Sequence, residues 1–285
     1  MGEIFELLKS LGSASMEARR VFAERTRDAE GLRVYRDDLS GVVYIDDFYV
    51  GDQAYQGGQY RDDRRERIGS PEFERYTDCT RRVNDYRQFI AGKDVLDFGC
   101  GDGHFLLASK ELARSVQGVE IEERQAQRLT ALGVQCSGGL PQAAVDSAFL
   151  LHVAEHLPRP IETLQQISAI IRPGGTLVVE VPHANDLLLQ DERFRAFSLW
   201  SQHLVLHTRE SLRRLLAAAG FRDTIIQGKQ RYPLSNHLHW LLHGKPGGHK
   251  KPLSVIDTPA LRSAYEASLQ HIDATDTLVA IATKA

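Results

Sequence analysis

Residues 95–106 read Val-Leu-Asp-Phe-Gly-Cys-Gly-Asp-Gly-His-Phe-Leu and combine a buried strand, a tight turn and the start of a helix. The first four residues form a short apolar run with one acid, which is typical of a parallel strand covered on both faces. The glycines that follow permit positive φ and let the backbone approach a ligand closely. Because helical spacing resumes at Phe105, the free N–H groups of a helix should point at whatever occupies the turn.

A second signal lies about twenty residues after this turn, the offset of a ribose-binding acid in nucleotide-binding α/β folds. Gly118-Val-Glu-Ile121 predicts a short strand that ends in an acid. The glycine spacing of residues 99–103 differs from the Gly-x-Gly-x-x-Gly fingerprint of dinucleotide folds. We therefore predict a nucleotide-type ligand held by the turn and by Glu120. The alternative is an ordinary β-α-β unit with a solvated Glu120.

Three later segments fit one family of enzymes. Residues 145–157 read as a strand followed by a Glu-His-Leu helix start, residues 170–175 as a turn before a strand, and residues 211–221 as a helix and a turn. In this order they resemble the class I S-adenosylmethionine (SAM)-dependent methyltransferases. The resemblance covers roughly residues 93–227. It implies a Rossmann-like α/β fold with a seven-stranded, mostly parallel sheet, in which residues 276–283 form a last strand antiparallel beside the sixth.

The same resemblance implies that SAM is the cofactor and binds at the carboxyl ends of the strands. Residues 135–141 depart from the family because they carry no acid for the adenine amine, so we expect backbone and apolar contacts near Gly139 there. Tyr60 is expected to close over the sulfonium, since ring faces attract cations, or else to lie in a surface turn. The expected cofactor residues are Asp97, Gly99, Cys100, Gly101, Gly103, Glu120, Ile121, Leu140 and Tyr60.

Methyl transfer is an in-line displacement, so the protein mainly has to hold the acceptor about 3–3.5 Å from the methyl carbon. A neutral oxygen acceptor must also lose a proton, a role that suits histidine. We predict His203, on the approach loop of residues 199–208, as the base or an acceptor-binding residue. His152 and His207 are further catalytic candidates, although His152 as a hydrogen-bonded residue that only shapes the pocket is an equal alternative. The acid of Glu155-His156 is expected mainly to stabilise a helix N-terminus.

Residues 228–260 form a long insertion, which we expect to be a lid over the acceptor; the alternative is a solvated loop that packs a helix on the sheet. Its basic and aromatic residues suit a phosphate or carboxylate and a sugar face. His239 and His243 have the spacing of a metal pair, but residues 231–251 contain no Asp, Glu or Cys, so no metal site is expected. The expected acceptor contacts are Tyr55, Asn236, His237, Trp240, Lys245 and His249.

The chain divides into an extension, residues 1–92, and a SAM-binding domain, residues 93–285. The extension should contain an amphipathic helix near residues 4–11, a second helix at residues 18–29, a β-hairpin, a Tyr/Gly-rich loop and a lead-in helix at residues 72–91. The predicted hairpin has strands at 31–35 and 42–45 and a polar turn at 36–41.

Composition narrows the function further. The chain has 285 residues and a net charge of −3, which gives no basic footprint for general nucleic-acid binding. Its three cysteines are too few and too scattered for a disulfide framework or a zinc site, and they fit a reducing, cytoplasmic location. No apolar stretch approaches the roughly 20 residues of a membrane span, and the N-terminus has no signal-peptide pattern.

The acceptor is indicated by a weaker resemblance. Residues 236–240, Asn-His-Leu-His-Trp, and the ending 275–278 resemble bacterial methyltransferases associated with surface-polysaccharide synthesis. This implies a small-molecule or saccharide acceptor, such as a hydroxyl of a sugar or of a phosphate-bearing saccharide. The alternatives are a methyltransferase for a quinone or another small metabolite, a tRNA- or protein-modifying enzyme, and a SAM-binding regulator without catalysis. The sequence assigns no oligomeric state.

Overall fold

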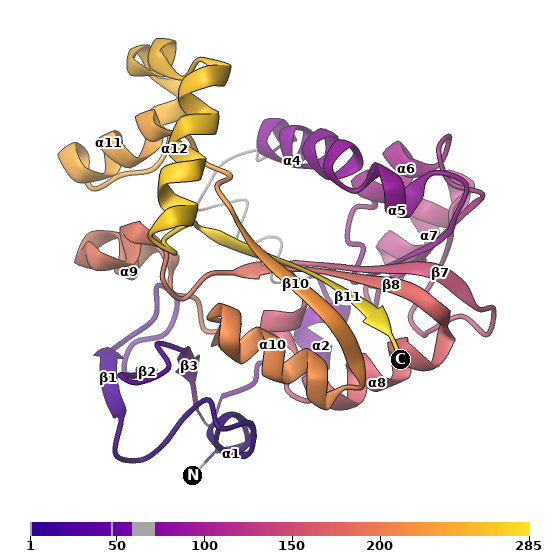
Figure 1. Cartoon of the computed structure of the whole chain (residues 1–285), viewed down its shortest axis with the longest axis horizontal. Helices are drawn as coiled ribbons and strands as arrows, with labels where there is room; N and C mark the ends of the chain where they lie inside the picture. The colour runs from indigo at the N-terminus through magenta and orange to yellow at the C-terminus, as the bar shows by residue number, and fades with distance from the viewer. Residues whose placement is uncertain (1, 47, 59–71) are drawn as a thin grey trace.

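The computed structural model describes residues 2–46, 48–58 and 72–285, and two sheets organise them (Figure 1). The larger sheet has seven strands in the order β10-β11-β8-β7-β4-β5-β6. Its strands are β4 (Asp94–Phe98), β5 (Ser115–Val119), β6 (Gln135–Ser137), β7 (Val145–Leu151), β8 (Ile171–Pro182), β10 (Phe221–Lys229) and β11 (Thr277–Lys284). The predicted seven-stranded, Rossmann-like sheet is confirmed.

The direction of the strands also follows the prediction. β4 pairs in parallel with β5 and β7, and β7 pairs in parallel with β8. β11 is antiparallel to both β8 and β10, between which it lies. Val95 and Leu96 of β4 are fully buried, as a central strand covered on both faces requires. The carboxyl ends of β4, β5, β7 and β8 therefore meet at one edge of the sheet.

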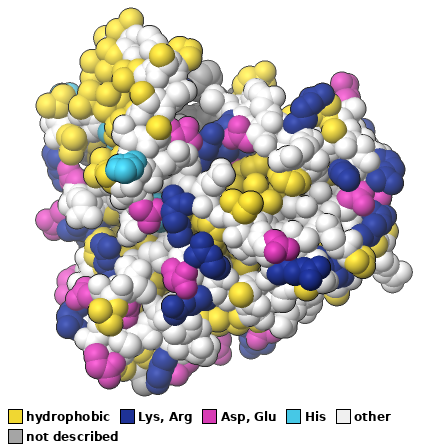
Figure 2. Space-filling view, in the orientation of Figure 1, with side chains coloured by type: hydrophobic (Ala, Val, Ile, Leu, Met, Phe, Trp, Pro, Cys, Tyr) yellow, Lys and Arg dark blue, Asp and Glu magenta, His cyan; other side chains and the backbone are white. Residues whose placement is uncertain are grey.

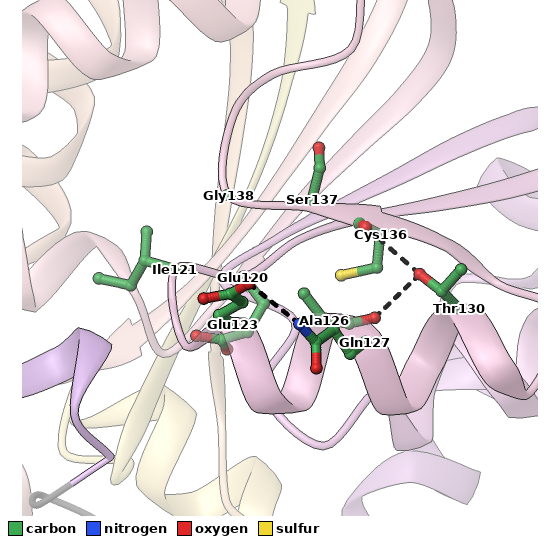
Figure 3. A pocket seen from close by; sticks show the side chains of 9 residues that line it. All are labelled: Glu120, Ile121, Glu123, Ala126, Gln127, Thr130, Cys136, Ser137 and Gly138. Atoms are coloured by element: carbon green, nitrogen blue, oxygen red, sulfur yellow. Dashed lines mark hydrogen bonds between the residues drawn. The ribbon is translucent and has the colours of Figure 1, made fainter.

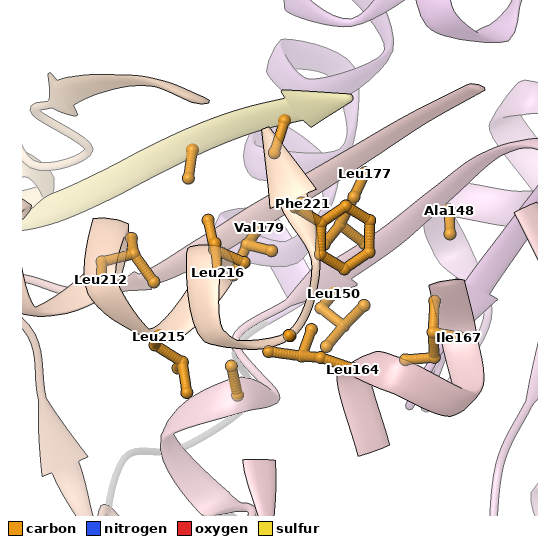
Figure 4. Close-up of a cluster of buried hydrophobic side chains, with 14 of the residues drawn as sticks. Ala148, Leu150, Leu164, Ile167, Leu177, Val179, Leu212, Leu215, Leu216 and Phe221 are labelled. Carbon is orange, nitrogen blue, oxygen red and sulfur yellow. The ribbon is translucent and has the colours of Figure 1, made fainter. Parts of the chain in front are cut away.

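Helices cover both faces of this sheet. On one face lie α8 (Pro160–Ile170) and α10 (Arg209–Ala218), whose Leu164 and Leu216 pack against Leu150 of β7 and Phe221 of β10 (Figure 4). Four of the described helices cover the other face, and each contributes side chains to a second apolar cluster. These helices are α4 (Glu72–Asp85), α5 (Arg87–Ile90), α6 (His104–Ser109) and α7 (Glu123–Ala131).

The N-terminal residues form the smaller sheet. Its order is β1-β2-β3-β9, with β1 (Arg19–Ala23), β2 (Val34–Asp37), β3 (Val43–Ile45) and β9 (Val205–Leu206). The predicted hairpin is present as β2 and β3, and α1 (Glu3–Ser10) packs beside it. The second predicted helix, at residues 18–29, is wrong. Those residues supply β1, because the edge of β2 offers backbone hydrogen bonds that a local pattern does not reveal.

Strand β9 links this sheet to the larger one. It belongs to the approach loop of residues 199–208, and Tyr44 of β3 pairs with Val205. The N–H of Leu204 donates to the carbonyl of Glu155, which lies in the 3₁₀ helix η1 (Ala154–His156) at the end of β7. His203 is thereby held between the two sheets. Between β8 and β9 lie η2 (Leu187–Gln190) and α9 (Glu192–Ser198).

The insertion after β10 forms a helical projection. It contains α11 (Leu234–His243), the 3₁₀ helices η3 (Gly248–Lys250) and η4 (Pro252–Ile256), and α12 (Pro259–His271), and it lies beyond the carboxyl end of β8 (Figure 1). Hydrophobic side chains gather over this part of the surface (Figure 2). Leu242 and Val255 are among the most exposed of them. Among the residues described, no helix combines the length and the apolar character that a membrane crossing requires.

Candidate active site

The turn after β4 leaves no room for a side chain at Gly99 or Gly103. Gly99, Gly101 and Gly103 all have positive φ, with values of 73°, 58° and 69°. A Cβ on Gly103 would lie 2.2 Å from Cδ2 of Leu129 in α7, and one on Gly99 would lie 2.6 Å from Cγ2 of Val153. Helix α6 begins directly after Gly103. The turn is therefore a backbone cradle at a helix start, as the sequence predicts.

Two acids line this cradle. Glu120, at the end of β5, accepts hydrogen bonds from the N–H of Gly101 at 2.8 Å and of Glu122 at 2.9 Å, so it ties the second strand to the turn. Asp97 is 3% exposed, and its Oδ1 has no hydrogen-bond partner among the residues described. Burial raises the pKa of Asp97 to about 8. A buried acceptor without a partner at a ligand loop is a group that a bound amine would satisfy.

A hollow of about 420 Å³ adjoins Glu120 (Figure 3). Its lining residues come from the ends of β5 and β6 and from α7, and include Ile121 and Gly138. Nothing lies within 4 Å of a Cβ built on Gly139, so the backbone beyond β6 borders open space. The volume is in the range of small-molecule sites. The hollow and the cradle together fit a nucleoside-bearing cofactor.

A cluster of histidines surrounds Glu155 at the carboxyl end of β7. The carboxylate of Glu155 is 1% exposed and accepts a hydrogen bond from Nδ1 of His152 at 3.2 Å. Burial would raise the pKa of Glu155, but the hydrogen bond from His152 and the neighbouring His156 lower it to about 2. The rings of His156 and His203 lie 4.9 Å apart, edge to face. Burial, and then the neighbouring His156, lowers the pKa of His203 well below its usual range.

His152 has both ring nitrogens engaged. Nη1 of Arg231 lies 3.3 Å from Nε2, and because a guanidinium only donates, Nε2 accepts and Nδ1 carries the proton given to Glu155. His152 also has a φ of 60°, an uncommon conformation for a residue that is not glycine. Burial and Arg231 lower its pKa. His152 is therefore hydrogen-bonded at both ring nitrogens, and its catalytic role stays a prediction.

A buried ion-pair network, which the sequence did not predict, covers the same edge. Glu180 of β8 is fully buried and accepts from Arg81 at 2.9 Å, from Nε of Arg82 at 2.8 Å and from Tyr86. Burial would raise the pKa of Glu180, but the two guanidinium groups hold it well below its usual range. The one available signal was a lone acid inside the apolar run of β8. Its partners lie too far away in the sequence to be inferred.

A second ion pair fastens α4 to the start of the insertion. Asp78 of α4 pairs with Arg231, the residue that contacts His152. Burial works against ionisation of Asp78, but Arg231 holds its pKa well below the usual range. The backbone N–H of Arg231 donates to Asp276. The helix α4, the insertion and the end of β7 are thus joined at one point.

The other predicted catalytic and aromatic residues are in different places. His207 is buried, its Nδ1 lies 3.0 Å from Oγ of Ser211 at the start of α10, and burial lowers its pKa to about 4. Tyr55, in α2 (Asp52–Gln56), lies against His156, with 6.1 Å between ring centres. Tyr60 lies outside the described residues. Tyr55 thus joins the histidine cluster, whereas His207 packs at a helix cap.

The predicted acceptor contacts in the insertion are mostly interior residues of the helical projection. Trp240 is 2% exposed and packs edge to face on Phe194, so its ring is not open to a sugar. His237 contacts Tyr265, and Asn236 accepts from the N–H groups of Gly247 and Gly248. A further pair lies nearer the surface: Lys245 is exposed, and His249 lies 5.6 Å from the ring of Tyr232.

These features agree with the comparison to known protein families. Residues 72–225, more than half of the chain, match the family described as methyltransferase domain. The chain belongs to this family of SAM-dependent methyltransferases, and SAM is the cofactor that the family implies. The residue-level assignments to SAM remain predictions, and the cradle, the orphaned Asp97 oxygen and the adjoining hollow fit them.

The chain is similar to several curated proteins over part of their length. It is 30% identical to a probable SAM-dependent methyltransferase of Mycolicibacterium smegmatis over 149 residues, which is 47% of this chain and 55% of that protein. It is 31% identical to a tRNA U34 carboxymethyltransferase of Idiomarina loihiensis over 115 residues, 35% of this chain and 36% of that protein. The chain thus spans about half or less of the length of these relatives.

A solved structure shows the same fold. A SAM-dependent methyltransferase from Archaeoglobus fulgidus superposes with a TM-score of 0.52 at 21% identity, covering 79% of this chain and 99% of that one. At this level of identity the likeness concerns the fold alone.

Proposed function

We propose that this protein transfers a methyl group from SAM to a small or medium-sized acceptor. The observation that carries the proposal is the glycine cradle tied to Glu120 beside the orphaned Asp97 oxygen. When bound, SAM supplies an electrophilic methyl group on a sulfonium. In this proposal Glu120 holds the ribose hydroxyls, Asp97 faces the amino group, and the residues at the end of β7 face the acceptor.

The acceptor atom that we propose is an oxygen. The edge beside the cradle carries Glu155, His156 and His203, groups that bind or deprotonate a hydroxyl, and Val153 in the same segment lies against Gly99 of the turn. A sugar hydroxyl on a saccharide used in surface-glycan synthesis is the specific acceptor that we propose, supported by the resemblance of residues 236–240 and by the exposed Lys245. We place the reaction in the cytoplasm, in keeping with three cysteines without disulfides.

A tRNA acceptor is the second candidate. It is favoured by the similarity to a tRNA U34 carboxymethyltransferase, which covers 35% of this chain. The net charge of −3 speaks for the small acceptor, because nucleic-acid binding depends on neutralising phosphates with Lys and Arg.

Calorimetry with SAM tests the cofactor assignment. The wild-type protein should bind SAM, while Gly101→Val, which fills the cradle, and Glu120→Ala, which removes the ribose partner and the tie to Gly101, should both lose binding. Glu210→Ala, at an exposed position on α10, is the control and should bind like wild type. Absence of SAM binding by the wild-type protein would refute the proposed function.

The acceptor is tested by mass spectrometry after incubation with SAM. Nucleotide sugars, quinone precursors and tRNA form the panel, and the expected result is the gain of one methyl group by a sugar. Methylation of tRNA alone would refute the sugar acceptor and support the tRNA acceptor.

A further inference from the structure

Three residues from two distant segments converge beside the glycine cradle. Glu155, His156 and His203 each offer one ligand atom, and these atoms all lie within 4.8 Å of one another. Two imidazoles and a carboxylate form a ligand set that suits divalent first-row transition metals. This cluster could not be predicted from local spacing, as the pair His239 and His243 could, because Glu155 and His203 come together only through folding.

The carboxylate has an unused oxygen. Oε1 of Glu155 accepts from His152, whereas Oε2 is buried and has no hydrogen-bond partner among the residues that the structure describes. A buried charge is costly unless it is paired or coordinates a metal ion. A cation beside His156 and His203 would satisfy this oxygen.

The histidines are oriented for such a role. Nδ1 of His156 donates to the carbonyl of Gln202 at 2.8 Å, so Nε2 is the ring nitrogen that would bind a cation. A carbonyl that holds the other nitrogen is the usual outer partner of a metal-ligating histidine. Trp200 packs edge to face on both His156 and His203, with ring centres 5.7 and 5.3 Å away. The two imidazoles are therefore held in place.

We propose that Glu155, His156 and His203 bind one divalent transition-metal ion, such as Zn²⁺ or Mn²⁺. Three protein ligands leave a coordination position open, as in catalytic rather than structural sites. The catalytic role of that open position rests on the proposed function, whereas the metal site itself does not. The open coordination position would receive the hydroxyl oxygen of the acceptor. That hydroxyl would lose its proton to water, and the O–CH₃ bond would form as the S–CH₃ bond of SAM breaks. In this role His203 is a metal ligand in place of a base.

Metal binding is measured directly on the full chain, without SAM or acceptor. Protein freed of metal with a chelator is titrated with Zn²⁺, Mn²⁺ and Mg²⁺ in separate calorimetry runs, and bound metal is counted by elemental analysis. We expect one Zn²⁺ or Mn²⁺ per chain. Glu155→Gln and His203→Gln should each weaken binding by at least about 100-fold, since loss of an outer partner alone costs 10–100-fold.

The surface pair on α11 provides a matched control. His239 and His243 lie four residues apart on α11, a spacing that suits two metal ligands, and their ring centres are 4.6 Å apart. The double variant His239→Gln/His243→Gln should keep the wild-type stoichiometry and affinity. Binding lost in this double variant, or unchanged in His203→Gln, would overturn the proposal. So would a protein that binds Mg²⁺ alone, because that ion prefers oxygen ligands.

Two further readouts separate failures of different origin. Thermal unfolding of each variant shows whether it is folded, and His203→Gln still tests the site if Glu155→Gln does not fold. SAM calorimetry on the metal-free protein tests the proposed function independently. Metal binding without SAM binding would refute the methyltransferase function but not the metal site. SAM binding without metal binding would refute the metal site but not the methyltransferase function.

Discussion

At the scale of single residues, backbone conformation and packing both select glycine at position 103. Its φ is 69°, and a Cβ would meet the side chain of Leu129 at 2.2 Å. Gly174, in the strand β8, has a similar φ of 73°, but nothing lies within 4 Å of its Cβ position. The two positions therefore separate the cost of conformation from the cost of steric overlap.

Gly103→Ala should be much more destabilising than Gly174→Ala. The left-handed backbone costs an L-residue about 1–2 kcal/mol at either position, and overpacking against Leu129 adds about 1–3 kcal/mol at position 103 only. Urea unfolding followed by circular dichroism measures both values. Equal losses in the two variants would mean that Leu129 moves aside without cost. SAM affinity should fall in Gly103→Ala and stay at the wild-type level in Gly174→Ala.

At the scale of secondary-structure elements, Glu180 fastens α4 to β8, an interior strand of the larger sheet. Its carboxylate is fully buried between Arg81, Arg82 and Tyr86, and α4 covers the sheet above it (Figure 1). Removing one partner of a buried charge network is strongly destabilising, because the remaining charges are left desolvated and unpaired.

Glu180→Gln should lower the free energy of unfolding by about 3–5 kcal/mol, because two guanidinium groups lose their counter-charge in a buried place. Chemical denaturation at pH 7 measures the change. Glu210→Gln is the control, since Glu210 pairs with Arg213 and Arg214 on the exposed side of α10. That substitution should cost less than about 1 kcal/mol. A loss of this small size at Glu180 would show that the network contributes nothing net.

At the scale of the whole molecule, buried ionisable groups act on stability in opposite directions. Burial raises the pKa of Asp97 and of Asp186 to about 8, so their contribution is full at acid pH and is lost as the pH rises from about 4 to 8. Burial lowers the pKa of His183 and of His237 to about 4 from 6.5. Their contribution is full above pH 6.5 and is lost as the pH falls toward 4. The contribution of one group is therefore measured as the difference in the free energy of unfolding between its variant and the wild-type protein at each pH.

Replacing His237 should flatten the acid side of the stability profile. Between pH 7.5 and pH 5 the wild-type protein loses about 2 kcal/mol through this residue, because the unfolded chain takes up a proton that the folded chain excludes. His237→Gln should not lose this free energy, so the difference in the free energy of unfolding between the wild type and the variant should narrow by about 2 kcal/mol from pH 7.5 to pH 5. Urea unfolding at both values of pH measures it. His271→Gln, at an exposed position on α12, should follow the wild-type profile, and parallel profiles for His237→Gln would contradict the assignment.

Much of the larger sheet was predictable because its signals are local. The glycine turn, the acid of Glu120 and the short apolar strands each depend on neighbouring residues, and the capping box of Thr208 and Ser211 at α10 is likewise written in four consecutive residues. The resemblance to the methyltransferases added the seventh strand and its antiparallel place beside the sixth. The strand β1 was not predictable, since residues 19–23 become a strand only when the edge of β2 is beside them.

For the site, the amino-acid sequence by itself determined the glycine turn and the position of Glu120 at the end of the next strand. Only the tertiary structure decided the partners of Glu155 and Glu180, because His203, Arg81 and Arg82 reach them from distant segments. It also decided that Trp240 is an interior residue, since burial depends on what α9 packs against it. The glycine turn needs only its own backbone, whereas a buried charge needs partners that folding brings from elsewhere in the chain.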